Sequence, residues 1–311
     1  MKTIINKKRI RIHLFFWVIV TSLFSGCKEE ELGNVADISG LGGDVWVKGP
    51  IDQWIYDSLT VPYNISVKYK WDQFEFNNLT RTLVPADESQ VLPLLRTIRN
   101  IWITPYVEDA GLTFFNKYSP KTFVLAGSNE YNTDGSVTLG TAEGGRKVIL
   151  FAVNDFKVKG MPGYQAADSS FVKQWFFQTI HHEFAHILHQ NKLYPQEYKQ
   201  ISSGLYQGGN WINFSDNDAR KDGFVTSYST SSFSEDFVEM IAVMLLEGKG
   251  GFDRIVNSIP EGNSINGTSK AQAQAALRTK EEMIVSYYKT AWNVDFYSLQ
   301  AKTKAALTKV L

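Results

Sequence analysis

The sequence has a single cysteine, Cys27, among its 311 residues. An intramolecular disulfide is therefore excluded, and so is a zinc site built from several cysteines. Thirty-two basic residues balance 32 acidic ones, so the chain lacks the positive excess with which proteins bind nucleic acid, and we expect no such partner. The apolar run near the N-terminus, Leu14–Leu23, is shorter than the about 20 residues that a membrane-spanning helix needs.

The first 27 residues resemble a bacterial lipoprotein signal peptide. A basic segment comes before the apolar run, and small residues then lead into the cysteine, in Leu23-Phe24-Ser25-Gly26-Cys27. In such signals the cysteine is lipidated and becomes the mature N-terminus; the alternative is an ordinary signal peptide with an incidental cysteine. The acidic run Lys28-Glu29-Glu30-Glu31 resembles the surface-export signal of Bacteroidetes lipoproteins, although a solvated linker has the same composition.

These features predict three parts of the chain. Residues 1–27 form the signal, residues 28–45 a flexible tether and residues 46–311 the folded domain. Lipid on Cys27 is expected to attach the protein to the outer membrane, where it is exposed at the cell surface or, alternatively, faces the periplasm.

Histidine is also rare, and four of the five histidines lie between His181 and His189. Within that run, His182-Glu183-Phe184-Ala185-His186 is an H-E-x-x-H motif, in which two imidazoles one helical turn apart can bind the same Zn²⁺. Glu183 lies about 100° around the helix from His182, where its carboxylate can take a proton from a water molecule beside the metal. The motif predicts a zinc peptidase with one Zn²⁺ per chain and Glu183 as its general base.

The chain around this motif has the order of elements that a zincin-type fold needs. We expect strands at 63–71, 122–126 and 147–153, a helix at 88–108 that ends or kinks at Pro105, the zinc helix from Asp168 to a point before Pro195, and later helices at 234–246 and 269–288. The predicted fold class is α+β. A mixed sheet lies over the active-site helix in a lobe of about 46–195, and a mainly helical lobe of about 196–311 follows. An edge strand, either 148–153 or 137–141, is expected to border the cleft and to pair with an extended peptide; the alternative is an interior strand without a role in binding.

A catalytic zinc site needs a third protein ligand. His189 lies near the same helix face, but it is about 10.5 Å from His182 along the axis, which favours a supporting or packing role. A later carboxylate is the better candidate, because Glu235, Asp236 and Glu239 begin an apolar helix. We predict that Glu235 binds the metal and that Glu239 orients a histidine ligand, with Glu239 and then Asp236 as alternative ligands.

At these residues a family resemblance becomes visible. The segments His-Glu-Phe-Ala-His (182–186) and Glu-Asp-Phe-Val-Glu (235–239) resemble the gluzincin arrangement of the anthrax lethal factor group. The longer segments 178–190 and 234–239, together with Phe224-Val225-Thr226-Ser227-Tyr228, are similar to the putative zinc-binding metallopeptidase lipoproteins of Bacteroidetes, which often accompany outer-membrane glycan-uptake systems. The resemblance implies that Tyr228 faces the zinc and stabilises the oxyanion.

We therefore predict a membrane-anchored, zinc-dependent endopeptidase that acts on a peptide or protein substrate. The alternative function is that of a surface lipoprotein that binds glycan or peptide for an uptake system and keeps a non-catalytic zinc site. Glu183 argues against this alternative, because a structural zinc site has no use for a carboxylate at that position. Hydrolysis of a non-peptide amide is compatible with the same chemistry.

Overall fold

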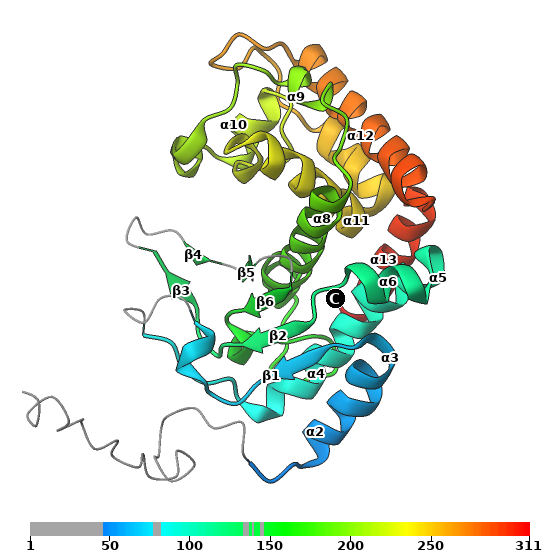
Figure 1. Ribbon diagram of the computed structural model, residues 1–311. Coiled ribbons are helices and arrows are strands. Elements are labelled where there is room, and N and C mark those ends of the chain that lie inside the picture. Colours follow the sequence, from blue (N-terminus) through cyan, green and yellow to red (C-terminus); the bar gives the residue numbers. More distant parts are fainter. Residues whose placement is uncertain (1–45, 77–81, 133–136, 139, 144–145) are drawn as a thin grey trace, which may run out of the picture. The chain divides into compact units, whose positions relative to one another are not determined.

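The computed structural model describes residues 46–76, 82–132, 137–138, 140–143 and 146–311 (Figure 1). The predicted signal at 1–27, with Cys27, and the predicted tether at 28–45 lie outside the described residues. Trp46–Leu311 forms one compact unit, in which helices predominate. In these ranges no helix is both long enough and apolar enough to cross a membrane.

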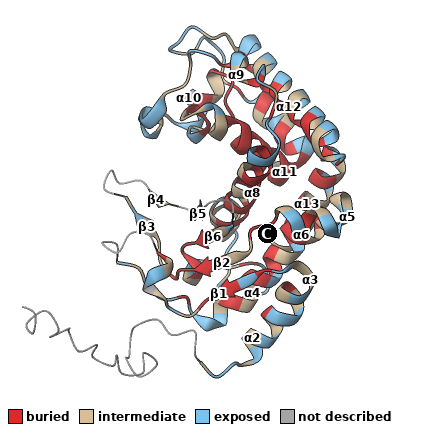
Figure 2. Cartoon of the chain, viewed as in Figure 1, coloured by how far each residue is buried: buried red, intermediate tan, exposed pale blue. Residues whose placement is uncertain are grey.

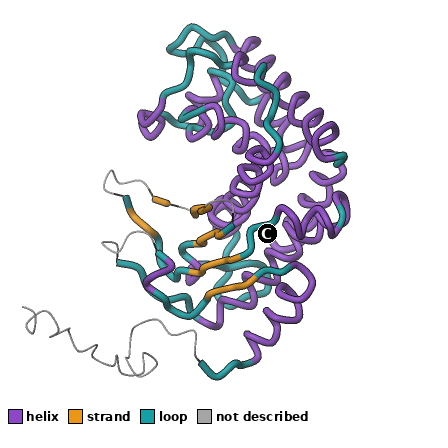
Figure 3. The backbone as a smooth tube through the Cα atoms, in the orientation of Figure 1, coloured by secondary structure: helices purple, strands orange, loops and turns teal. Residues whose placement is uncertain are grey.

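A small mixed sheet confirms the predicted α+β class. Its strand order is β1-β2-β6-β5; β1, β2 and β6 are parallel, and β5 runs antiparallel to β6. Two further strands form a separate antiparallel pair (Figure 3). The strands are β1 Ser66–Lys68, β2 Thr122–Leu125, β3 Glu130–Tyr131, β4 Val137–Thr138, β5 Gly140–Glu143 and β6 Lys147–Leu150.

Two predictions about the strands were wrong. The strand expected at 63–71 pairs only over Ser66–Lys68, because Tyr63 ends a helix and Asn64 turns the chain with a left-handed φ of 54°. The segment at 148–153 is not an edge strand, since β6 pairs with β2 on one side and β5 on the other. The edge next to β6 is β5, which overlaps the other candidate, 137–141.

The two central strands, β2 and β6, are buried on both faces of the sheet. Phe123 of β2 belongs to the main core, whereas its neighbour Val124 belongs to a small cluster with Phe76, as expected for alternating side chains. Trp102 is fully buried, with ring centroids 5.9 Å from Phe123 and 5.3 Å from Phe184. These rings join the sheet to the helix that carries the H-E-x-x-H motif.

The helix predicted at 88–108 does not end at Pro105. It continues from α4, Glu88–Ile98, through a π-helical segment, Arg99–Ile103, into α5, Thr104–Ala110. The N–H of Thr104 bonds to the carbonyl of Arg99, five residues back. The wider turn accommodates the proline ring, which would collide with a carbonyl in a regular α-helix. Three short helices flank this unit: α2 Pro50–Ile55, α3 Val61–Tyr63 and α6 Leu112–Tyr118.

Every regular element after residue 150 is helical, as predicted for the C-terminal part. The helices are α7 Asp168–Val172, α8 Thr179–Asn191, α9 Tyr198–Ile201, α10 Asp216–Lys221, α11 Phe233–Asn257, α12 Lys270–Trp292 and α13 Phe296–Val310. Helix α8 is largely buried and lies between the sheet and the C-terminal helices, in contact with β5 and α11 (Figure 2). The long helix α11 is interrupted at Gly248, where φ is 68° and an added Cβ would lie 2.9 Å from Cγ of Lys304.

Candidate zinc site

The H-E-x-x-H motif lies on a buried helix, as its sequence predicts. Helix α7 continues through a π-helical segment, Lys173–Gln178, into α8, so the chain is helical without a break from Asp168 to Asn191. Ile180 and Phe184 point into the core and are almost fully buried. His182 and His186, one turn apart, lie on the other side and face α11.

Three side chains converge above this helix. Nε2 of His182 lies 3.1 Å from Nε2 of His186. Oε2 of Glu235 lies 3.0 Å from the first of these nitrogens and 3.2 Å from the second. Of the described residues, these three alone form a group of histidine, cysteine or acidic side chains with the spacing of a metal site.

The start of α11 places Glu235 in this group. Ser232 is the N-cap of the helix, and its hydroxyl accepts a hydrogen bond from the backbone N–H of Glu235 at 3.3 Å. Glu235 is therefore fixed in the first turn, where a carboxylate is also favoured by the helix dipole. The following turn of α11 carries Glu239 on the same face.

The three groups fit a zinc ion. Tetrahedral zinc with bonds of about 2.0–2.2 Å to nitrogen and oxygen holds neighbouring ligand atoms roughly 3.3 Å apart, which is close to the observed triangle. The site also stabilises a positive charge on His182. Burial opposes a charged His182, but hydrogen bonds with Glu235 and Glu239 outweigh burial and raise its pKa to about 10. Burial favours a neutral Glu235, yet His182 and His186 hold the pKa of that carboxyl far below its usual range. A zinc ion can replace this bound proton.

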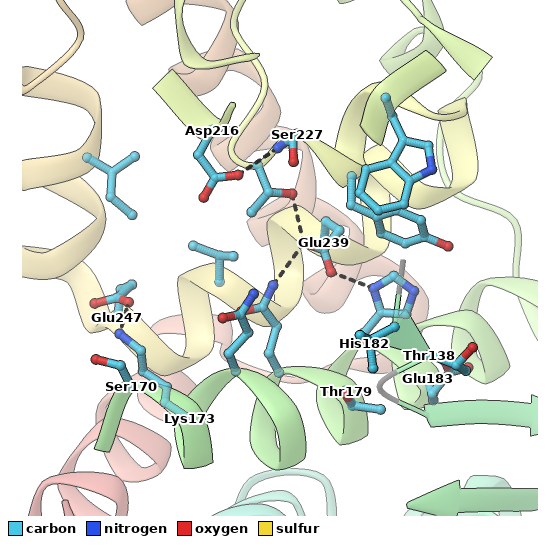
Figure 4. A pocket seen from close by; sticks show the side chains of 18 of the residues that line it. Thr138, Ser170, Lys173, Thr179, His182, Glu183, Asp216, Ser227, Glu239 and Glu247 are labelled. Carbon is cyan, nitrogen blue, oxygen red and sulfur yellow. Dashed lines mark hydrogen bonds and ion pairs between the residues drawn. The ribbon is translucent and has the colours of Figure 1, made fainter. Parts of the chain in front are cut away.

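Glu239 holds His182 in place. Its Oε1 lies 2.7 Å from Nδ1 of His182, so Nε2 of this histidine stays available to a metal. Its Oε2 accepts hydrogen bonds from Nε2 of Gln178 at 2.9 Å and from Oγ1 of Thr226 at 2.8 Å (Figure 4). One carboxylate thus ties together the zinc helix, α11 and the loop before Tyr228.

His189 contacts the second histidine of the motif. Its Nε2 lies 3.0 Å from Nδ1 of His186. Burial lowers the pKa of His189 to about 4, so the ring is neutral at pH 7 and can accept a hydrogen bond from His186. His181 takes no part in the group: it is fully buried near Tyr106, with ring centroids 6.0 Å apart, and burial lowers its pKa to about 3.

Asp236, the last of the alternative ligands, has a different partner. It is fully buried, and its Oδ2 forms an ion pair with Nζ of Lys280 at 2.8 Å. It also accepts a hydrogen bond from the hydroxyl of Tyr206 at 2.8 Å. The structure therefore directs Asp236 away from the two motif histidines and toward α12.

Glu183 and Tyr228 face the same cavity as His182. Burial raises the pKa of Glu183, although the nearby His182 and His186 partly offset this effect. The ring of Tyr228 lies 5.8 Å from that of His182. Burial, and then the charge of Glu235, raise the pKa of its phenol, so Tyr228 keeps its proton and can donate a hydrogen bond.

Comparison with known proteins places this geometry in a family. A family model described as "putative zinc-binding metallo-peptidase" matches residues 44–297. The chain belongs to this family. It is also similar to the crystal structure of a putative zinc-binding metallo-peptidase from Bacteroides caccae, with 30% sequence identity, a TM-score of 0.66, and coverage of 83% of this chain and 92% of that one. No curated protein gives a significant match. The resemblance inferred from the motifs is thereby confirmed at the level of the family.

Sequence reasoning missed the partners of Glu239 and one wall of the cavity. Gln178 lies one helical turn before His182, and Thr226 two residues before Tyr228, so their closeness in sequence to predicted site residues is the signal that points to both. Trp211 lines the cavity and its ring lies 4.9 Å from that of Tyr228. Nothing in the local sequence places this tryptophan near the motif.

We expect changes in this group to separate metal ligands from their supports. His182→Ala or Glu235→Ala should reduce bound zinc to well below one ion per chain, because each removes one of three protein ligands. Glu239→Gln should weaken zinc binding by about 10–100-fold. Zinc content and competition with a chelator measure both effects, and Glu261→Ala, at an exposed glutamate, is the control. Loss of zinc to well below one ion per chain in Glu239→Gln but not in Glu235→Ala would reverse the two assignments.

Proposed function

We propose that this family member is a zinc-dependent endopeptidase. The observation that carries the proposal is the position of Glu183, whose carboxylate lines the cavity beside the His182–His186–Glu235 group and has no hydrogen-bond partner among the described side chains. A metal site that served structure alone would have no use for this carboxylate. When bound, a zinc ion supplies Lewis acidity that activates water and polarises a carbonyl.

The chain's own groups account for the proton transfers. Glu183 takes a proton from the attacking water and delivers it to the departing amine. Its raised pKa suits both steps, because the group must accept and then release a proton near neutral pH. Tyr228 donates a hydrogen bond to the oxyanion that develops on the scissile carbonyl. Glu239 and His189 keep the two histidine rings oriented.

The edge strand β5 supports an extended peptide as substrate. Among the described strands, β5 pairs only with β6, and it contacts α8, which carries the motif. A strand with one unpaired edge can bind an extended peptide through backbone hydrogen bonds. We further propose that lipid on Cys27 anchors the enzyme in the outer membrane at the cell surface, where an uptake system for glycans would be its neighbour.

Digestion of a broad peptide library by the purified full-length protein tests the activity. We expect cleavage inside the peptides, loss of cleavage after removal of zinc with a chelator, and recovery when Zn²⁺ is added. Mass spectrometry of the products identifies the bonds cut. Stoichiometric zinc without cleavage of any peptide would contradict the proposal and favour the binding-protein alternative.

A further inference from the structure

A long cavity begins at the zinc group and extends along the zinc helix. Its volume is about 530 Å³, within the range of small-molecule sites. Figure 4 shows His182 and Glu183 at one end and the pair Lys173–Glu247 at the other. His182 and Lys173 are nine residues apart on one helix, which corresponds to roughly 13 Å along its axis. This length is greater than any amino-acid side chain can span.

Two ion pairs line the part of the cavity that lies away from the zinc group. Nζ of Lys173 lies 2.5 Å from Oε1 of Glu247. In the second pair, a guanidinium nitrogen of Arg220 lies 3.5 Å from Oδ2 of Asp216. Paired charges give this part of the cavity no net attraction for an acidic or a basic group. Its preferred occupant is therefore neutral.

Most of the side chains that line the cavity carry a polar group. Only three of the lining residues are aliphatic: Val137, Val243 and Ile255. In the part of the chain that the structure describes, the hydroxyls of Ser170 and Ser227 have no hydrogen-bond partner. The same holds for the exposed amide of Gln174. Donors and acceptors that are free to bind a ligand favour an occupant rich in hydroxyl groups.

Two aromatic side chains line the cavity beside the zinc group, where the ring of Tyr228 lies 5.8 Å from that of His182. Trp211 and Tyr228 pack edge to face, with ring centroids 4.9 Å apart, and both line the cavity. Both side chains keep part of their surface accessible to a ligand: Tyr228 is 37% exposed and Trp211 is half-buried. An aromatic surface beside hydrogen-bonding groups suits a molecule with one apolar face and a polar rim.

We propose that this cavity binds a sugar carried by the peptide substrate, close to the bond that is cut. A neutral sugar matches the paired charges, its hydroxyls match the free amide and hydroxyl groups, and its C–H face matches the indole of Trp211. The inference rests on the proposed peptidase function and names its substrate class, a glycosylated peptide.

Matched peptides test this inference. The two peptides of a pair share one sequence that the enzyme cleaves, and only one of them carries a single neutral sugar on a serine or threonine. A series of such pairs places the glycosylated residue at each position within three residues of the scissile bond. We expect kcat/KM for at least one glycosylated peptide to exceed that of its plain partner by about tenfold or more, because sites built to bind a hydroxyl discriminate strongly against its absence.

Two variants assign the preference to the cavity. Trp211→Ala and Gln174→Ala should each lower the ratio of the two kcat/KM values at least about fivefold, since truncation of a contact residue removes its share of binding. Trp71→Ala, at another partly exposed tryptophan (42% exposed) that does not line the cavity, should leave the ratio unchanged. Gln174 is exposed, so its variant is expected to fold even if loss of Trp211 disturbs the loop.

Binding to zinc-loaded Glu183→Gln separates this inference from the proposed function. We expect the glycosylated peptide to bind about tenfold more tightly than its plain partner in calorimetric titrations. If Glu183→Gln binds both peptides equally and the native protein cleaves both equally, the sugar site is overturned and the peptidase function stands. If the glycosylated peptide binds more tightly and the zinc-loaded native protein cleaves neither peptide, the sugar site is supported and the peptidase function is overturned.

Discussion

Glu183→Gln is expected to bind zinc as the native protein does and to cleave peptides about 10²–10⁴-fold more slowly, the range typical of losing a general base. The amide has the same size as the carboxylate and cannot accept the proton. The metal group should be unaffected, because Glu183 is not among the three converging ligands. Since the carboxylate has no hydrogen-bond partner among the described side chains, the change should not disturb the fold.

Zinc content and kcat/KM on one library-derived peptide measure this outcome in the same preparation. Glu261→Gln makes the same chemical change at an exposed glutamate, whose side chain is 86% exposed, and should keep native activity. Cleavage at the native rate would remove Glu183 from its assigned role. Loss of zinc along with loss of cleavage would show that Glu183 supports the metal group, and the rate would then say nothing about proton transfer.

The helix that carries the motif could be predicted because the residues that define it are close together in the sequence. Side chains four residues apart on a helix point the same way, so the sequence alone put His182 and His186 together. The same reasoning placed Glu235 and Glu239 on one face of a second helix. Their division of roles needed tertiary structure: Glu235 meets the Nε2 atoms of both histidines, whereas Glu239 meets Nδ1 of only one.

The strands were predicted less well, because a strand is defined by its partner. Alternating residues extend beyond β1 in the sequence, but the pairing with β2 covers only three residues. The edge position of β5 depends on its antiparallel pairing with β6, and no periodicity within four residues reveals it. Pro105 shows a limit of a local rule: a proline ends or kinks a helix, and only the structure shows that a π-helical turn lets this helix continue.

Asp236 shows how a distant residue decides between neighbours. In sequence it is as plausible a ligand as Glu235, which precedes it. In the structure, Lys280 of α12 donates hydrogen bonds to Asp236 at 3.0 Å and to the carbonyl of Gly223 at 2.8 Å, and both charged side chains are fully buried. Lys280 thereby connects α12, the first turn of α11 and the segment that leads to Tyr228.

Removal of Lys280 should consequently be one of the most destabilising single changes in the chain. Lys280→Met leaves the carboxylate of Asp236 buried without its counter-ion, and we expect a loss of about 3–5 kcal/mol in the free energy of unfolding. Urea denaturation of the zinc-free protein measures this loss without the added stability that a bound metal contributes. Lys289→Met, on the exposed surface of the same helix, should change the value by less than about 0.5 kcal/mol.

The double variant Asp236→Asn/Lys280→Met should recover most of that loss. Burial raises the pKa of Asp236 and lowers that of Lys280, and in each case the partner's charge offsets burial only in part. Both shifts favour the neutral forms, so the ion pair itself contributes little net stability and the large cost arises from leaving one charge alone. An asparagine can still accept the hydrogen bond from Tyr206 and carries no charge. If the double variant were as unstable as Lys280→Met, the loss would come from the buried carbonyl of Gly223, which has lost its hydrogen bond from Lys280 in both variants, and not from an uncompensated charge.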